Sequence, residues 1–459
     1  MSAPTPANHT LSAREKIGYG LGDTASNFIF HTVNVFLFFY YADVMKLNAA
    51  AVGTLFLVAR LFDTVTDPLM GSIADRTNTR WGKYRPYLLW LAIPFGICGY
   101  LLFAVPDTDP SSQLTYAYIT YIAVMLVYTA INIPYSALLG VITPNSSERT
   151  SVASYRFACA FGGQLLIVAA ARPLIAYFGE GDQAAGYRVT MGIFAVIAVV
   201  LFIMTFSMTR ERVQPPADQK SDLAKEFKLL LRNVPWIVMF IAGIFTLANV
   251  AVRGAVTLFY FKYYAGDDGS AWLWNFDMST VFLTAGTFAL IVGVMCTKWI
   301  TPLGDKRQLM VVLSSLNAVV MALFYFVPQD APGMMFFMNV LGALIAGPTI
   351  PLVWSMFADV ADYGEWKFGH RSTGLVFSGV QFAQKFGLAI GSAMAGWMLA
   401  GFGYVADVEQ SPEAIQGIRL MFTVLPALFA VGGVVAIWFY PITGKDVERM
   451  GRELAESKI

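Results

Sequence analysis

The chain has 459 residues, of which 57% are hydrophobic and only 13% are charged. A water-soluble domain is about 25% charged, so this composition excludes a water-facing surface and indicates a protein covered by lipid. The net charge of +1 lacks the basic excess that nucleic-acid binding requires. Three widely spaced cysteines (Cys98, Cys159 and Cys296) exclude a disulfide framework and a zinc motif.

The apolar segments predict an all-α polytopic membrane protein. About 20 mainly apolar residues cross the roughly 30 Å of hydrocarbon in a bilayer. Residues 1–16 are polar, and the apolar segment after them is too long for a signal peptide, so we expect a first span and no cleavable signal. The twelve predicted spans are 17–44, 50–74, 86–106, 114–142, 150–178, 187–208, 234–262, 273–297, 308–328, 333–358, 372–402 and 416–440.

Lysine and arginine predict the orientation, because cytoplasmic connections are enriched in them. The even-numbered connections and both tails are rich in these residues, whereas the odd-numbered connections are acidic or uncharged. We therefore expect both termini to be cytoplasmic. The hydrophilic stretch 209–233 divides the spans six and six and predicts two bundles related by duplication, although self-similarity is weak. The predicted parts are an N-terminal six-helix bundle (1–208), the central loop (209–233), a C-terminal six-helix bundle (234–441) and a cytoplasmic tail (442–459).

The second predicted span carries charges that a bilayer does not tolerate without a reason. Asp63 and Asp67 are one helical turn apart on one face, and Arg60 lies near the same face. Two neighbouring carboxylates favour a bound cation, either Na⁺ held by oxygen ligands or H⁺. The alternative is a structural network in which Arg60 neutralises one acid and water reaches the other.

Other spans carry polar residues at helical spacing. Span 1 presents a stripe of Asp23, Asn27, His31 and Asn34, which supplies the donors and acceptors that a sugar needs. His31 also fits a packed interior histidine. In the same way, span 4 contributes Asn132 and Ser136, and span 10 has Trp354, which could stack on a sugar ring. Span 11 has Gln381 and Lys385, and Lys385 lies too deep to reach the interface. A salt bridge to the other half is the alternative for Lys385, and Arg253 in span 7 is a weaker case of the same kind.

Several motifs together resemble one transporter family. They are the segment from Gly53 through Asp63, Asp67 and Pro68 to Gly71, then Arg80-Trp-Gly-Lys83-Tyr-Arg85-Pro86, Asn132-Ile-Pro-Tyr135 and Asp359-Val-Ala-Asp362-Tyr-Gly-Glu365. This chain resembles the glycoside–pentoside–hexuronide:cation symporters, the melibiose-permease relatives within the major facilitator superfamily. The resemblance runs from about residue 14 to the tail, and it implies twelve helices in two six-helix bundles with a central site reached by alternating access.

The resemblance also implies roles for individual residues. Asp63 and Asp67 match the family's cation-binding acids, and Thr129 matches a cation-site threonine. With their neighbours, the expected cation site is Asp63, Asp67, Thr66, Thr129 and Asn132. The expected substrate site is Asp23, Asn27, His31, Asn34, Asn132, Ser136, Arg156, Trp354, Gln381 and Lys385. Arg60, Asp359, Asp362, Glu365 and Arg371 match the charged cytoplasmic network that latches the two halves.

The chain departs from melibiose permeases at four positions. Those permeases have acids where this chain has Asn27 and Asn132, and tryptophans where it has Ser136 and Ile350. Two missing acids and two missing stacking rings argue against melibiose as the substrate. The Asn132-Ile-Pro-Tyr135 sequence resembles the glucuronide- and xyloside-type branch, in which H⁺ coupling is plausible.

These observations predict a secondary active transporter of the inner membrane that symports a sugar, glycoside or hexuronide with H⁺ or Na⁺. We expect a monomer with no cofactor other than the coupling ion, no certain metal site and no nucleic-acid partner. The chain has no HExxH sequence, Gly-rich phosphate loop or Cys/His pair, which argues against a membrane enzyme. The alternative is a nutrient sensor or facilitator with the carrier fold and no cation coupling.

Overall fold

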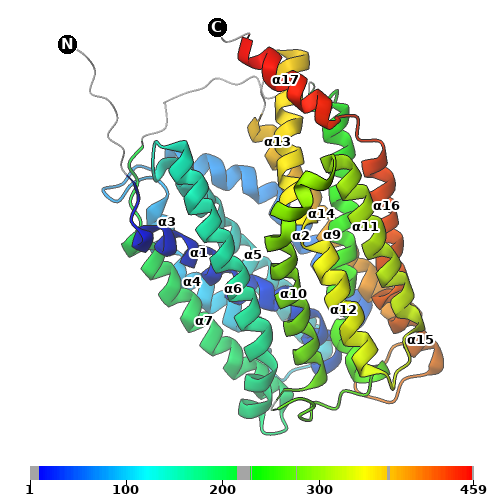
Figure 1. Ribbon diagram of the computed structural model, residues 1–459. Helices are drawn as coiled ribbons and strands as arrows, with labels where there is room; N and C mark the ends of the chain where they lie inside the picture. The colour runs from blue at the N-terminus through cyan, green and yellow to red at the C-terminus, as the bar shows by residue number, and fades with distance from the viewer. Residues whose placement is uncertain (1–9, 214–227, 229, 275, 370–372, 457–459) are drawn as a thin grey trace. The chain divides into compact units, whose positions relative to one another are not determined.

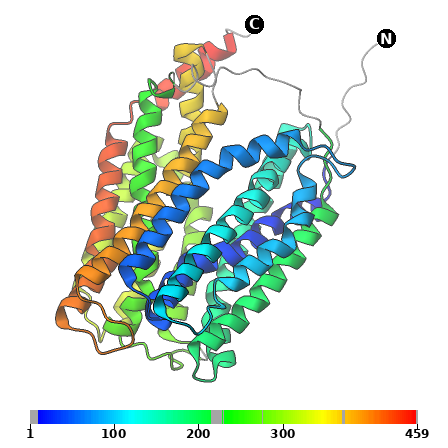
Figure 2. The ribbon, with the colours of Figure 1, turned by 180° about the vertical axis from the view of Figure 1, so that it is seen from behind.

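The computed structural model describes residues 10–213, 228, 230–274, 276–369 and 373–456. Within these residues the regular structure is helical, and only two isolated β-bridges interrupt it, one of them Thr79 with Gly82. The all-α prediction is therefore confirmed. Figures 1 and 2 show the long helices from opposite sides.

The chain divides into two compact units. Unit 1 comprises Met1–Leu47 and Val58–Asp218, and unit 2 comprises Asn48–Leu57 and Gln219–Ile459. The helices from the N-terminus to the end of unit 1 are α1 (Ala13–Thr32), the π-helical turns η1 (Val33–Leu37) and η2 (Tyr40–Val44), α2 (Ala49–Arg76), α3 (Arg85–Trp90), α4 (Ala92–Leu101), α5 (Pro110–Val141), α6 (Ser146–Gly179) and α7 (Gln183–Met208).

Unit 2 contains the remaining helices. They are α9 (Val234–Phe259), the π-helical turn η3 (Tyr260–Tyr264), α10 (Met278–Ile300), η4 (Thr301–Leu303), α11 (Lys306–Leu323), η5 (Phe324–Phe326), α12 (Pro332–Ala346), α13 (Thr349–Phe368), α14 (Thr373–Gly401), α15 (Pro412–Phe422), α16 (Val424–Trp438) and α17 (Gly444–Glu456). The first turns of α2 group with this unit, since a Cβ on Gly53 would lie 2.8 Å from the carbonyl oxygen of Ala393 in α14.

Helix starts follow ordinary capping chemistry. Asp109 accepts from the Ser112 amide at 3.0 Å, directly before Pro110 in the first turn of α5. Ser411 caps α15 in the same way, again followed by a proline. A side-chain oxygen at this position satisfies an amide that the helix leaves free, and proline lacks the amide that would be left over. These local signals explain why the helices begin where they do.

Each predicted span corresponds to a helical segment. Nine segments of the described residues are long and apolar enough to cross a membrane. The other three predicted spans also form helices: 17–44 lies in α1 with its π-helical turns, 86–106 is divided into α3 and α4 at Leu91, and 372–402 is α14. The segment predicted as 333–358 extends further, to Phe368, because α13 continues past the apolar stretch into charged residues.

Both units use the same packing order. In unit 1, α1 packs against α6 and α7, and α4 packs against α7. In unit 2, α9 packs against α14 and α16, and α11 packs against α16. The first membrane-crossing segment of each unit thus contacts the fifth and sixth, and the third contacts the sixth.

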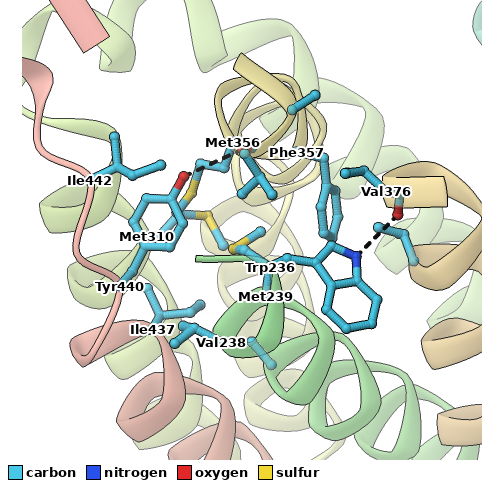
Figure 3. Close-up of a cluster of buried hydrophobic side chains, with 14 of the residues drawn as sticks. Trp236, Val238, Met239, Met310, Met356, Phe357, Val376, Ile437, Tyr440 and Ile442 are labelled. Carbon is cyan, nitrogen blue, oxygen red and sulfur yellow. Dashed lines mark hydrogen bonds between the residues drawn. The ribbon is translucent and has the colours of Figure 1, made fainter. Parts of the chain in front are cut away.

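A buried apolar cluster in unit 2 holds α13 in place (Figure 3). Trp236 of α9 donates from its indole nitrogen to the Val376 carbonyl at 3.4 Å, and Tyr440 donates to the Met356 carbonyl at 3.4 Å. The cluster extends to Met450 of α17, which is 2% exposed. Figure 1 shows α17, in red, beside the end of α13. The tail helix therefore belongs to the same packed core as the charged end of α13.

Candidate functional site

The two acids of α2 meet a threonine of α5 in unit 1. The Thr129 hydroxyl lies within hydrogen-bonding distance of Asp63 Oδ1 and 3.0 Å from Asp67 Oδ1. Asp63 is 4% exposed and Thr129 is 3% exposed. The carboxylates, one helical turn apart, thus share one hydroxyl in a buried setting. Nearby in sequence, the Thr66 hydroxyl donates to the Asp63 carbonyl at 2.9 Å.

Arg60 connects the acid-bearing helix with the polar stripe of the first predicted span, at Asn34 in η1. Its guanidinium donates to Asn34 Oδ1 at 2.5 Å and lies 5.5 Å from the centre of the Phe30 ring. Arg60 is 3% exposed. The amide of Asn34 is therefore engaged with an arginine, so this member of the predicted substrate stripe lies beside the acid-bearing helix.

A second charged pair joins α1 and α6. Arg156 donates to both oxygens of Asp23, with distances of 3.0 and 3.3 Å from its Nε and NH2 atoms. Its guanidinium also lies 5.0 Å from the centre of the Tyr135 ring. Tyr135 stacks on Tyr19 with ring centres 4.8 Å apart, and each of these two hydroxyls donates to the other residue's carbonyl. A bidentate ion pair backed by two stacked rings results.

Asn27 lies next to this pair. Its amide nitrogen donates to the Asp23 carbonyl at 2.9 Å, and its side-chain oxygen accepts from Gln164 at 3.4 Å. Within the described residues, His31 Nε2 and Asn132 Oδ1 are buried atoms without a hydrogen-bond partner. Asn132 donates from its nitrogen to the Tyr128 hydroxyl at 3.1 Å. These groups have hydrogen-bonding capacity left for a ligand. Ser136 is half-buried on the same helix.

The predicted substrate residues of unit 2 lie on two helices. Trp354 of α13 is half-buried and contacts the Phe357 ring, with centres 6.3 Å apart. In α14, Gln381 is exposed and Lys385, one turn later, is half-buried.

Three residues of the predicted cytoplasmic network lie on one helix of unit 2. Asp359 of α13 forms an ion pair with Lys306 at 2.7 Å and is 7% exposed. Lys306 follows Asp305, which caps α11 by accepting from the Arg307 amide at 3.2 Å. Asp362 and Glu365 lie on the same helix as Asp359 and are half-buried. Arg371 lies outside the described residues.

Sequence reasoning missed three members of these clusters. Gln164, Tyr19 and Lys306 were not among the predicted site residues. Charge spacing within one helix could not reveal them, because each partner lies on a different helix. Tyr19 is flanked by glycines in the sequence, whereas Tyr135 follows Pro134, so no shared sequence signal marked the ring pair.

Comparisons with known proteins agree with this architecture. Residues 18–444 match the model of the MFS/sugar transport protein family. An inner membrane symporter of Escherichia coli is 36% identical, over 98% of this chain and 96% of that protein. An isoprimeverose transporter of Lactiplantibacillus pentosus is 36% identical, over 93% of this chain and 88% of that protein.

Solved structures show the same fold. The E. coli xylose transporter matches with a TM-score of 0.64 at 13% identity, covering 96% of this chain and 98% of that one. Identity this low supports the fold alone. The family match and the relatives identify the chain as a membrane transporter and not an enzyme. This chain belongs to the MFS/sugar transport protein family, within the glycoside–pentoside–hexuronide:cation symporters of the major facilitator superfamily.

Proposed function

We propose that this transporter symports a sugar or glycoside with H⁺, and that Asp63 and Asp67 carry the proton. The observation behind this proposal is the single Thr129 hydroxyl between the two carboxyl groups. A hydroxyl has one hydrogen, so Thr129 donates to only one of them. The other contact is a hydrogen bond only if that carboxyl group is protonated and donates to the threonine oxygen. The geometry thus fits an acid pair that holds one proton.

The residue at position 132 argues against Na⁺ as the coupling ion. Na⁺ would replace the proton between two ionised carboxylates and would need further oxygen ligands around it. Asn132 stands where melibiose permeases have an acid, so one anionic ligand is missing here. Two acids and one shared hydroxyl are enough to bind and release a proton, which requires no ligand cage.

We further propose that the sugar binds at the cluster around Asp23, Asn27 and Arg156. A carboxylate, an amide and a guanidinium together offer both donors and acceptors, which a polyhydroxy ligand requires. The stacked rings of Tyr19 and Tyr135 hold this cluster rigidly from one side. The remaining predicted substrate residues, His31, Asn34, Asn132, Ser136, Trp354, Gln381 and Lys385, stay candidates for the same role.

Orientation and assembly are also proposals. The arginine and lysine residues of the even-numbered connections support an inner-membrane protein with both termini in the cytoplasm. In that orientation, the Asp359–Lys306 pair belongs to the cytoplasmic network that opens and closes access to the site. We expect one chain to transport by itself, because the candidate ion and sugar residues all belong to it.

The purified full chain in proteoliposomes tests the coupling. We expect an inward proton gradient, in the absence of Na⁺, to drive accumulation of isoprimeverose or methyl β-D-glucoside. Asp63→Asn and Asp67→Asn should each reduce accumulation about 100-fold or more, because the shared proton is lost, while sugar counterflow persists. Thr129→Val should reduce coupling, and Thr129→Ser should restore it.

The matched control is Thr120→Val on the same helix, since that hydroxyl donates to its own helix carbonyl at 2.8 Å. This variant should transport normally. Accumulation that requires a Na⁺ gradient would contradict H⁺ coupling. Exchange without uphill accumulation would indicate a facilitator, and binding without exchange would indicate a sensor.

A further inference from the structure

A cavity of about 500 Å³ lies in unit 2 between the end of α13 and the tail helix α17. Neither the proposed proton site nor the proposed sugar cluster includes any residue that lines it. Sites for small organic ligands range from about 300 to 1,000 Å³, so a ligand the size of a monosaccharide fits this space. The lining residues used below are Tyr363, Trp366 and Lys367 of α13 and Asp446, Arg449 and Met450 of α17.

The two helices that form the walls of this cavity are fixed to one another (Figure 1). Met450 is 2% exposed and belongs to the apolar cluster of unit 2. The Trp366 indole nitrogen donates to Glu453 Oε2 at 2.5 Å, and the ring centres of Trp366 and Tyr363 lie 5.9 Å apart. The protein itself therefore holds the walls in place, which lowers the free-energy cost of ordering them around a ligand.

Each wall contributes one cation that lies over an aromatic ring. The Lys367 ammonium is 5.1 Å from the centre of the Tyr363 ring, and the Arg449 guanidinium is 5.1 Å from that of the Trp366 ring. A ring face attracts a cation without neutralising its charge. The rings therefore hold both charges at the cavity and leave them able to pair with an anion.

Both cations keep hydrogen-bond donors that the described residues do not use. Lys367 donates to the Tyr363 hydroxyl at 2.7 Å, and among the described residues it forms no ion pair. An ammonium has three N–H groups, so two remain. Arg449 donates to Asp446 at 3.1 Å, and a guanidinium has five N–H groups. A ligand at this cavity can therefore accept from both side chains.

The carboxylates near the cavity are already engaged. Asp446 accepts from the Thr443 hydroxyl at 2.7 Å and from the Thr443 amide at 3.0 Å, in addition to Arg449. Glu453 accepts from Trp366. A ligand thus meets unused donors and used acceptors, a combination that favours an anion with several oxygen atoms.

We propose that this cavity binds a phosphomonoester, whose phosphate group pairs with Lys367 and Arg449. A lysine in the last turn of a helix and an acid–arginine pair along a helix are each common by themselves, but here two such cations from different helices meet at one cavity. A phosphate group has three acceptor oxygens and close to two negative charges at neutral pH, which match an ammonium and a guanidinium.

The phosphate group has two sources, a soluble ester such as a sugar phosphate and the headgroup of a lipid. In the proposed orientation the tail helix lies on the cytoplasmic side, where both are present. The binding itself does not depend on the proposed transport activity.

The test compares glucose 6-phosphate with glucose. Binding is measured by calorimetry with the full chain in phosphatidylcholine nanodiscs. We expect glucose 6-phosphate to bind at least about tenfold tighter, because charge-assisted hydrogen bonds to two cations are added. Lys367→Gln and Arg449→Gln should each lower this ratio several-fold and leave the affinity for glucose unchanged. Lys298→Gln is the matched control and should keep the ratio, since this lysine lies 4.3 Å from the centre of the Trp299 ring but does not line the cavity.

A second arm distinguishes the source of the phosphate group. If the unmodified chain does not prefer glucose 6-phosphate, but phosphatidic acid in the nanodiscs raises its Tm and not that of the Lys367 and Arg449 variants, a lipid supplies the phosphate and the proposal stands in that form. If neither response depends on Lys367 and Arg449, the proposal is overturned.

A misfolded variant does not leave the question open. Should Arg449→Gln fail to reach the membrane because its contact with Trp366 is lost, Lys367→Gln decides alone, since Lys367 is exposed at the end of α13. An unchanged ratio in that variant would overturn the proposal. Binding is measured without any ion gradient, so a failure here is distinct from a failure of the proposed H⁺ coupling.

Discussion

The π-helical turns that follow α1 and α9 show that the two units repeat one design. In η2 the Met45 amide donates to the Tyr40 carbonyl at 2.9 Å, and in η3 the Ala265 amide donates to the Tyr260 carbonyl at 3.0 Å. Each tyrosine then packs against two rings from the third and sixth spans of its unit. These rings are Phe103 and Tyr187 in unit 1 and Phe324 and Phe422 in unit 2.

At the opposite end of these helices, both units repeat a second contact. Arg85 in unit 1 donates to the Phe206 carbonyl at 2.7 Å, and Arg307 in unit 2 donates to the Trp438 carbonyl. In both units, an arginine at the start of the third span thus holds the last turns of the sixth. An acid adds a second contact between the same two regions, but a different region supplies it in each unit. In unit 1, Glu211 lies after the sixth span and accepts from amides of the loop before the third span. In unit 2, Asp305 lies in that loop and accepts from an amide after the sixth span.

The difference between the units lies in their charges, not in their framework. Unit 1 holds the neighbouring acids of α2 and an arginine paired with Asp23, whereas unit 2 holds Arg253 on aromatic rings. A duplicated scaffold can therefore keep its helix ends and exchange the groups between them. The candidate chemistry resides in those exchanged groups.

The largest effect is expected when the ion pair of Asp23 with Arg156 in unit 1 is broken. Asp23→Asn would leave Arg156 without its carboxylate and should destabilise the protein by about 2–3 kcal/mol, because a partly buried cation loses its partner. The melting temperature in detergent measures this. The double variant Asp23→Asn, Arg156→Gln should recover stability but not sugar binding. Equal melting of Asp23→Asn and the unmodified chain would mean that the pair is dispensable.

A smaller effect is expected when the acids Glu211 and Asp305, which accept from backbone amides near the third and sixth spans, are neutralised. Glu211 accepts from the amides of Lys83, Tyr84 and Arg85 at 2.8 to 2.9 Å, so Glu211→Gln should loosen that loop, because it replaces charge-assisted bonds. Trypsin cleavage after Arg80 and Lys83 should become several-fold faster. Asp305→Asn should have a smaller effect on unit 2 than Glu211→Gln has on unit 1, since Asp305 accepts from only two amides. Identical cleavage in both variants and the unmodified chain would show that Glu211 does not hold the loop.

The smallest expected effect concerns the ring clusters. The Tyr40 hydroxyl donates to the Phe103 carbonyl at 2.9 Å, whereas the structure gives the Tyr260 hydroxyl no such bond within the described residues. Tyr40→Phe should therefore cost about 1 kcal/mol of stability and Tyr260→Phe close to none. Melting of the two variants side by side checks this. Equal losses would mean that the two clusters are more alike than their hydrogen bonds indicate.

The sequence was sufficient for features that depend on local periodicity. Apolar segments of about 20 residues predicted the helical spans, and the spacing of Asp63 and Asp67 placed both acids on one face. The internal repeat was nearly invisible at this level, because the corresponding residues at the helix ends, such as Val33 and Arg253, are chemically different.

Only the tertiary structure decided which side chains meet across helices. Thr129 was expected near the acids solely through the family resemblance, and its place between both carboxyl groups comes from the packing of α5 on α2. The pair of Asp23 with Arg156, and the absence of such a partner for Arg253 among the described residues, likewise depend on helix packing. Periodicity fixes the face on which a residue lies, whereas the rotation and depth of the neighbouring helix determine what that face contacts.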